Sequence, residues 1–246
     1  MKAIHIKIIV GLCLAWSMTG AWGDSGAGSN VSAAQTGATV PASISKEVKM
    51  KEHKSGTWTP GLSDEEKQTL FTIAKDTLDW CVSKKKSPFP MESYKLTPKL
   101  KVPMATFVTL KIKGDLRGCI GSLAPVEALY LSVHHNAINA AMEDFRFSPV
   151  QPVELPRLEI DVSILSPIRN ITSLDEFKLG QMGIILEKGM RRAVFLPEVA
   201  VEQGWTKEKT LSHLSQKAGL PPDAWQKDAR FQVFESVVLS LDEVTN

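Results

Sequence analysis

The segment Leu116–Leu123 (LRGCIGSL) contains residues that folding alone explains poorly. Two glycines flank a cysteine in a stretch that otherwise has the pattern of a β-strand. Glycine weakens strand pairing and usually marks a bulge or a close approach by another backbone or by a ligand. Side chains two positions apart share one face of a strand. We therefore expect Arg117 and Cys119 on one face, with a guanidinium beside a thiol.

A positive charge next to a thiol favours the thiolate, lowers the pKa of the cysteine and makes it a better nucleophile. A helix expected to start at Pro125 would add the positive end of its dipole. The pattern predicts a reactive Cys119, activated by Arg117, that acts on a small carbonyl-containing or otherwise electrophilic substrate. Two alternatives remain open. Cys119 is a small buried hydrophobe while Arg117 pairs with an acid elsewhere, or the protein is a non-catalytic binding module for a partner protein or a small ligand.

Two other charged residues are candidates for the same site. Arg146 lies in residues 143–149 (EDFRFSP) and could pair with Asp144 or with an incoming carboxylate, of which the first is the commoner arrangement. Glu198 stands in the first turn of an expected short helix, where the helix dipole favours an acid whatever else the residue does.

Common catalytic and cofactor motifs are absent from the 246 residues. The chain has no CxxC, HExxH, GxSxG, Walker A or GxGxxG pattern, which removes the usual zinc, serine-hydrolase and nucleotide-binding assignments. His134 and His135 are consecutive on an expected helix, about 100° apart, so they cannot easily bind one metal ion. The sequence therefore indicates no metal site and leaves any cofactor unknown.

The composition is that of a soluble globular protein, with 43% hydrophobic and 23% charged residues. The 29 basic residues nearly balance the 27 acidic ones, for a net charge of +2. Such a balance argues against nucleic acid or an anionic membrane surface as the main partner.

Residues 1–23 have the pattern of a secretory signal peptide, with two early lysines, an apolar run and a small-x-small ending at Ala21-Trp22-Gly23. The protein is expected to be periplasmic or secreted, or membrane-anchored if the leader is not cleaved. Residues 24–61 are poor in apolar side chains and predict a flexible tether. Cleavage would remove Cys13 and leave Cys81 and Cys119, for which a disulfide is an alternative to a reactive thiol.

Residues 62–241 predict one mixed α+β domain, because strands occur as hairpins and helices intervene irregularly. The expected helices are Ser63–Ser83, with a capping box at Ser63 and Glu66, then Pro125–Met142, Glu198–Glu202 and Lys207–Ala218. The expected strands are Thr106–Lys113, Leu116–Ser122, Leu158–Ile164, Met182–Leu186, Ala193–Leu196 and Phe231–Leu239.

Six motifs occur in order along this domain: LRGCIGSL, the Asn136-Ala137 and Ala140-Ala141 spacing, DFRFSP, ELP, FLPEVAVEQGW and KAGLPPDAW. Together they resemble the AMMECR domain, the family known in bacteria as AmmeMemoRadiSam system protein A. The resemblance covers about Leu62 to Leu239.

The resemblance implies a larger and a smaller lobe with a cleft between them. It places Arg117, Gly118, Cys119 and Gly121 in the cleft, together with Arg146 and Glu198. It also suggests a shared pathway with Memo-type and radical SAM proteins, but it does not name a substrate.

Overall fold

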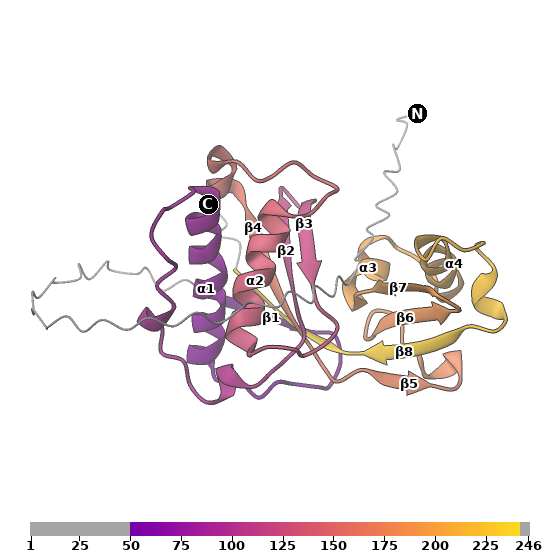
Figure 1. Cartoon of the computed structure of the whole chain (residues 1–246). Helices are drawn as coiled ribbons and strands as arrows, with labels where there is room; N and C mark the ends of the chain where they lie inside the picture. The colour runs from indigo at the N-terminus through magenta and orange to yellow at the C-terminus, as the bar shows by residue number, and fades with distance from the viewer. Residues whose placement is uncertain (1–49, 242–246) are drawn as a thin grey trace, which may run out of the picture.

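Alternating apolar and polar residues build two antiparallel sheets in the computed structural model, which describes residues 50–241 (Figure 1). The larger sheet has the strand order β1-β9-β4-β2-β3. Its strands are β1 (Met50–Lys54), β2 (Thr106–Ile112), β3 (Asp115–Gly121), β4 (Glu159–Leu165) and β9 (Ser236–Leu241).

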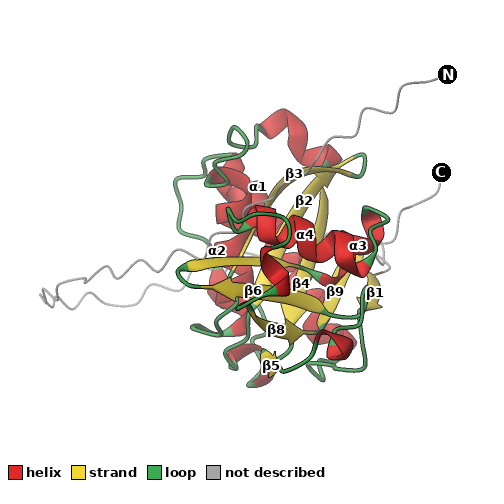
Figure 2. Ribbon diagram, turned by 90° about the vertical axis from the view of Figure 1, so that its right-hand side faces the viewer, coloured by secondary structure: helices red, strands yellow, loops and turns green. Residues whose placement is uncertain are grey.

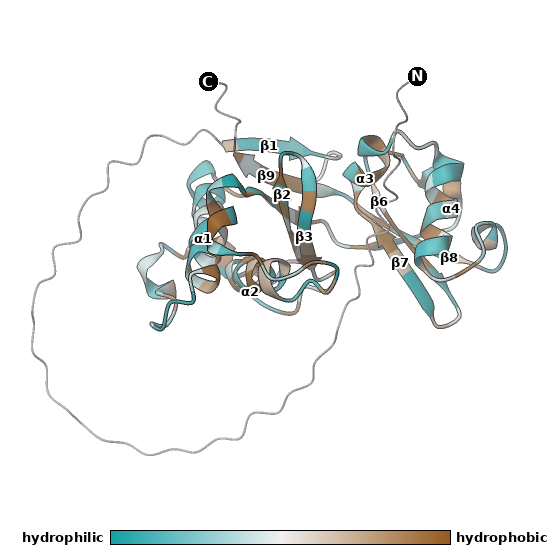
Figure 3. Ribbon diagram, turned by 90° about the horizontal axis from the view of Figure 1, so that it is seen from above, coloured by the Kyte–Doolittle hydropathy of each residue, from teal (hydrophilic) through white to brown (hydrophobic). Residues whose placement is uncertain are grey.

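Two helices cover one face of this sheet, α1 (Asp64–Val82) and α2 (Leu129–Met142), as Figures 1 and 3 show. The capping box expected at the start of α1 is present. The Ser63 side chain accepts a hydrogen bond from the Glu66 N–H, and the Glu66 carboxylate accepts one from the Ser63 N–H. The main hydrophobic core lies between the helices and the sheet, where Val108, Leu110 and Val162 meet the apolar face of α1.

The smaller lobe is a four-stranded sheet with two short helices. The sheet has the order β5-β8-β6-β7, formed by β5 (Arg169–Ile171), β8 (Arg230–Phe234), β6 (Gly183–Lys188) and β7 (Arg191–Phe195). The helices are α3 (Pro197–Glu202) and α4 (Lys207–Lys217), which face the viewer in Figure 2. Short 3₁₀ turns complete the two lobes: η1 (Met91–Ser93), η2 (Lys99–Lys101), η3 (Pro152–Arg157), η4 (Leu174–Glu176) and η5 (Ala224–Gln226).

Two adjacent chain segments connect the lobes. One runs from β4 into β5 and the other from β8 into β9, and between them the Ser166 N–H donates to the Glu235 carbonyl at 2.9 Å. The single strand predicted over Phe231–Leu239 is therefore two strands, because the chain leaves one sheet and enters the other at Glu235. A third hydrophobic cluster, which includes Phe107, Ile185 and Phe234, packs the lobes together.

The mixed α+β class with a larger and a smaller lobe is confirmed, as are both predicted hairpins, but the expected start of the folded unit at Leu62 is too late. Residues Met50–Lys54, assigned to the tether, form the edge strand β1 and pair with β9. A polar edge strand of this kind is held by backbone hydrogen bonds, so its apolar content does not reveal it. The predicted signal peptide and residues 24–49 lie outside the described residues. Within residues 50–241, no helix is long and apolar enough to cross a membrane.

Candidate functional site

A cavity of about 530 Å³ lies between the two lobes, on the face of the larger sheet opposite α1 and α2. The larger lobe contributes the outward side chains of β2, β3 and β4, and the smaller lobe contributes the end of β7, α3 and the end of α4. Its size is typical of sites for small organic molecules. The residues that carry polar chemistry are Thr109, Lys111, Asp115, Cys119, Arg146, Asp161, Glu198, Glu202, Gln203 and Lys217.

Period-2 alternation places Cys119 on the cavity side of the sheet. In β2, Val108 and Leu110 face the helices while Thr109 faces the cavity, and Thr109 is directly opposite Cys119 in β3. Cys119 is buried, with 8% of its surface exposed, and its sulfur accepts a hydrogen bond from the Thr109 hydroxyl at 3.3 Å. The Thr109 hydroxyl is therefore in direct contact with the sulfur on the cavity side of the sheet.

The Asp144–Arg146 pair holds the backbone of Cys119. Strand β3 is an edge of its sheet, so one side of its backbone has no strand partner. The Asp144 carboxylate accepts the Cys119 N–H at 2.9 Å, and Arg146 Nη2 donates to the Cys119 carbonyl at 3.1 Å. Arg146 also binds Asp144 at 2.6 Å, which is the pairing the sequence favoured. Burial opposes ionisation of Asp144, but the bonds from Arg146 and Cys119 hold its pKa below the ordinary value.

Arg117 does not lie beside the Cys119 thiol, so the prediction of a shared face was wrong. The β2–β3 register shifts between Leu110, which faces Gly118, and Lys111, which faces Leu116, so Arg117 is the extra residue of a bulge. Its guanidinium makes a bidentate ion pair with Glu154 of η3, at 2.8 and 3.0 Å, and does not line the cavity. This is the pairing with a distant acid that the sequence left open.

Gly118 and Gly121 are also absent from the cavity wall. A Cβ at Gly118 would overlap the Ala140 carbonyl of α2, and one at Gly121 would overlap the Phe107 ring. Both glycines therefore allow close packing of the protein against itself, and neither gives a ligand access to the sulfur.

The predicted contribution of a helix dipole to the thiol is also contradicted. Helix α2 begins at Leu129, four residues after Pro125, and its first turn lies near Val102, to whose carbonyl the Leu129 N–H donates. The end of α2 that approaches β3 is the C-terminal one, at Ala140. That end of a helix carries partial negative charge and would not favour a thiolate.

Glu198 was also proposed from the sequence as a site residue, and it lies in the cavity with Cys119. It stands in the first turn of α3 and lines the cavity with Val199 and Glu202. Burial raises the pKa of the Glu198 carboxyl to about 7. Near neutral pH this group can therefore both accept and donate a proton.

Comparison with known proteins identifies the chain. The sequence profile of the AMMECR1 family matches residues 71–239. The chain belongs to the AMMECR1 family. It is 35% identical to a protein of Methanosarcina barkeri over 188 residues, which cover 74% of this chain and 93% of the relative. It is 38% identical to a protein of Thermococcus gammatolerans over 174 residues, which cover 67% and 84% of the two chains.

The fold matches that of a solved structure. The crystal structure of an uncharacterized protein from Pyrococcus horikoshii superposes with a TM-score of 0.67 at 33% identity and covers 72% of this chain and 92% of its own. The resemblance stated from the motifs and the α+β class it implied are thus confirmed. Of the six residues placed in the cleft, Cys119, Arg146 and Glu198 line it, whereas Arg117, Gly118 and Gly121 do not.

Sequence reasoning missed Lys217, the most deeply buried charge in the cavity of this AMMECR1-family chain. Lys217 ends α4, is 7% exposed, donates to the Val194 carbonyl at 2.8 Å and lies 4.8 Å from the centre of the Phe195 ring. Its signal was available, because it follows Leu211 and Leu214 on the apolar face of the helix. A lysine is rarely buried at such a position unless its ammonium is bound by other groups of the protein.

The cavity also contains Lys111, which joins the two lobes. Its ammonium binds Asp161 of β4 at 3.1 Å and Glu202 of α3 at 3.2 Å. Burial lowers the pKa of Lys111, but the two carboxylates outweigh it and raise the pKa to about 12. Lys111 is therefore a structural cation under all ordinary conditions.

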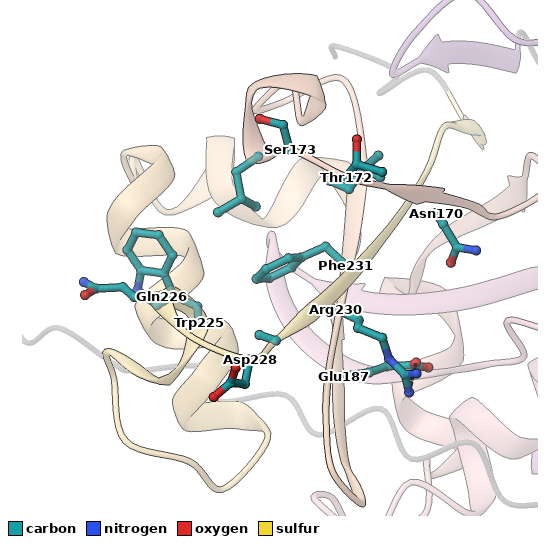
Figure 4. Close-up of a pocket in the computed structure, with 12 residues that line it drawn as sticks. Asn170, Thr172, Ser173, Glu187, Trp225, Gln226, Asp228, Arg230 and Phe231 are labelled. Carbon is teal, nitrogen blue, oxygen red and sulfur yellow. Dashed lines mark ion pairs between the residues drawn. The ribbon is translucent and has the colours of Figure 1, made fainter.

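A second cavity, of about 590 Å³, lies within the smaller lobe (Figure 4). It is lined by Trp225 of η5, Phe231 of β8 and polar residues of the segment after β5. Glu187 at its rim is paired with Arg230 at 3.7 Å. It contains none of the six candidate site residues proposed from the sequence and no cysteine, so the cavity between the lobes is the candidate site. Among the residues that the structure describes, no cluster of His, Cys, Asp or Glu could hold a metal ion.

No disulfide joins Cys81 and Cys119 in the structure. Cys81 belongs to α1 and packs against the main core, whereas Cys119 belongs to the cluster between the lobes. Burial raises the pKa of the Cys81 thiol to about 11. The two cysteines therefore lie in different parts of the molecule.

Proposed function

We propose that the cavity between the lobes binds a small organic molecule and that Cys119 is a nucleophile that attacks it. The observation that carries the proposal is that one cavity contains both the Cys119 thiol and Glu198, a carboxyl whose pKa is raised by burial to about 7. Nucleophile and proton-transfer group in one small, partly desolvated site are the usual elements of covalent catalysis. The Thr109 hydroxyl, rather than Arg117, is the polar side chain that donates to the sulfur.

The reaction class is addition of sulfur to an electrophilic carbon. The thiol gives up its proton, the sulfur forms a bond to a carbonyl-type carbon, and the electron pair of the C=O bond moves onto oxygen. Glu198 in its carboxylate form accepts the thiol proton, and in its protonated form it supplies a proton to the oxygen. The proton gained in the first transfer is the one returned in the second, so the step needs no external reagent.

The test is alkylation of the folded protein with iodoacetamide between pH 6 and 9, with the labelled cysteine identified by peptide mass spectrometry. Cys119 should react with an apparent pKa clearly below the ordinary thiol value of about 8.5. Cys81 is the internal reference, because its pKa of about 11 should leave it almost unlabelled over this range. A Cys119 that is labelled only after unfolding in urea would overturn the proposal.

Cys119→Ser distinguishes catalysis from binding alone. If the protein is an enzyme, the variant should keep its fold and lose turnover of its substrate. A variant that preserves every measured activity would favour the alternative, a binding module in which the cysteine has no chemical role.

A further inference from the structure

One wall of the cavity is a row of three side chains from three adjacent strands. Thr109 of β2 is directly opposite Cys119 of β3 on one side and Asp161 of β4 on the other. All three residues line the cavity. Because neighbouring strands lie about 4.8 Å apart, the two ends of the row are separated by about 10 Å. The cavity therefore has a cysteine end and a carboxylate end, and one small elongated ligand can reach both.

Two cations belong to the cysteine end. Arg146 donates to the Cys119 carbonyl and is balanced by Asp144. Lys217 donates to the carbonyl of Val194, which packs in the same cluster as Cys119. A positively charged group of a ligand is not attracted to this end.

The carboxylate end has more acids than cations. Helix α3 brings Glu198 and Glu202 close to Asp161, and the three acids influence one another electrostatically. Lys111 is bound by two of them, Asp161 at 3.1 Å and Glu202 at 3.2 Å. Three carboxyl groups thus share one ammonium, and Glu198 is the one that does not bind it.

Glu198 is enclosed by protein but open to the cavity. Protein surrounds its carboxyl on almost every side, and the part of the residue that remains accessible lines the cavity. In residues 50–241 no cation forms an ion pair with it. Loss of water is the main cause of its raised pKa, which the distant charge of Lys111 only partly offsets. Because an ionised carboxylate without a partner is costly to bury, a cation that enters the cavity would be bound most strongly here.

We infer that the substrate is a small organic cation, an amine or an amidine, whose charged group binds the Glu198 carboxylate while its electrophilic carbon faces Cys119. The position of the reacting carbon rests on the proposed function, but the preference for a cation can be measured without it. A bound cation would stabilise the carboxylate form of Glu198, which is also the form that accepts the thiol proton in the proposed reaction.

The first measurement compares benzamidine with benzamide, which have nearly the same shape but differ in charge. Their binding to Cys119→Ser is followed by ligand-observed NMR at pH 8, so that the result does not depend on the thiol. Benzamidine should bind about tenfold more tightly than benzamide. Adding Glu198→Gln, which keeps the size of the side chain and removes its charge, should abolish most of the difference.

Glu208→Gln is the matched control. Glu208 stands in the first turn of α4, as Glu198 does in α3, but it is exposed and is not in the cavity. Its replacement should leave the preference for benzamidine unchanged. Equal binding of the two probes, no binding of benzamidine at millimolar concentration, or a preference that Glu198→Gln leaves intact would overturn the inference.

The second measurement follows the affinity for benzamidine with pH. Only the carboxylate form of Glu198 attracts the cation, and the pKa of this group is about 7 in the free protein. The affinity should therefore rise about tenfold between pH 6 and pH 8. In Glu198→Gln it should stay nearly constant, and a rise of the same size in that variant would contradict the assignment to Glu198.

The third measurement tests the orientation of the ligand. Two chloroacetamides are compared, whose four-carbon chains end in an ammonium or in a methyl group. Relative to the unfolded chain, the cationic reagent should label Cys119 about tenfold faster than the neutral one, and Glu198→Gln should remove the advantage. If Cys119 resists all alkylating reagents but benzamidine is preferred, the proposed function is wrong and the preference for a cation stands. If Cys119 is reactive but neither measurement shows a preference for the cation, the inference is wrong and the proposed function stands.

Discussion

Glu198 and Lys217 are charged groups whose behaviour is set by their place in the cavity. Glu198 is on a short helix at the lobe boundary, and loss of water around its carboxyl is the main cause of its raised pKa. Lys217 is fixed by a carbonyl and a ring of the same lobe. Each residue costs folding free energy to bury, which a protein tolerates most often where the group is used.

Glu198→Gln should change how stability depends on pH. The pKa of the Glu198 carboxyl is about 7 in the folded protein against an ordinary value of 4.5, so the folded state holds this proton more tightly. The stabilisation is complete below about pH 4.5 and is lost as the pH rises through 7, by up to about 3 kcal/mol. In urea unfolding at pH 4.5 and pH 8, the variant should therefore gain up to about 3 kcal/mol relative to the wild type at the higher pH. A difference between the two proteins that is the same at both pH values would contradict the role of burial.

At the scale of elements, the edge strand β3 is shaped by three neighbours. Helix α2 approaches so closely that position 118 has room only for glycine. At the bulge the Arg117 side chain pairs with Glu154 of η3. Asp144 and Arg146 bind the backbone N–H and carbonyl of Cys119. These contacts fix the direction of the Cys119 side chain, and the Thr109 hydroxyl of β2 donates a hydrogen bond to its sulfur.

Gly118→Ala should test the close approach of α2 to β3. The new Cβ would overlap the Ala140 carbonyl, which is backbone and cannot rotate away. We expect a loss of about 2–4 kcal/mol in the free energy of unfolding. Gly114→Ala is the control, because its Cβ would meet nothing within 4 Å and the cost is limited to about 1 kcal/mol for its φ of +75°. Equal losses in the two variants would argue against the contact.

At the scale of the whole molecule, the two lobes behave as one packed unit. Ile185 of the smaller lobe and Phe107 of the larger lobe are almost fully buried in a shared cluster, next to the segments in which β4 continues to β5 and β8 to β9. The cavity walls come from both sides of this junction. The site therefore exists only when the lobes are docked.

Ile185→Ala should destabilise both lobes together. Removing a fully buried isoleucine costs about 2–4 kcal/mol, and urea unfolding should remain a single transition with an unchanged slope. Glu202→Gln, which removes the ion pair with Lys111 across the lobes, should cost less than about 1 kcal/mol because the pair is partly exposed. Two separate transitions in Ile185→Ala would show that the lobes fold independently.

The sequence by itself determined the local elements and the identity of the candidate nucleophile. The capping box at Ser63 and Glu66 and the alternation of apolar residues in both hairpins depend on neighbours a few positions apart, so they could be read directly. Cys119, Arg146 and Glu198 were recognised because their residue types are unusual in their settings or belong to motifs of the family.

Only the tertiary structure decided which side chains share the cavity. At Arg117 a bulge interrupts the period of two on which the sequence argument relied, and the guanidinium pairs with Glu154, 37 positions away. The sheet change at Glu235 and the entry of Lys217 into the site depend on how the lobes pack against each other. Such contacts join segments far apart in the chain, and no local pattern of residues encodes them.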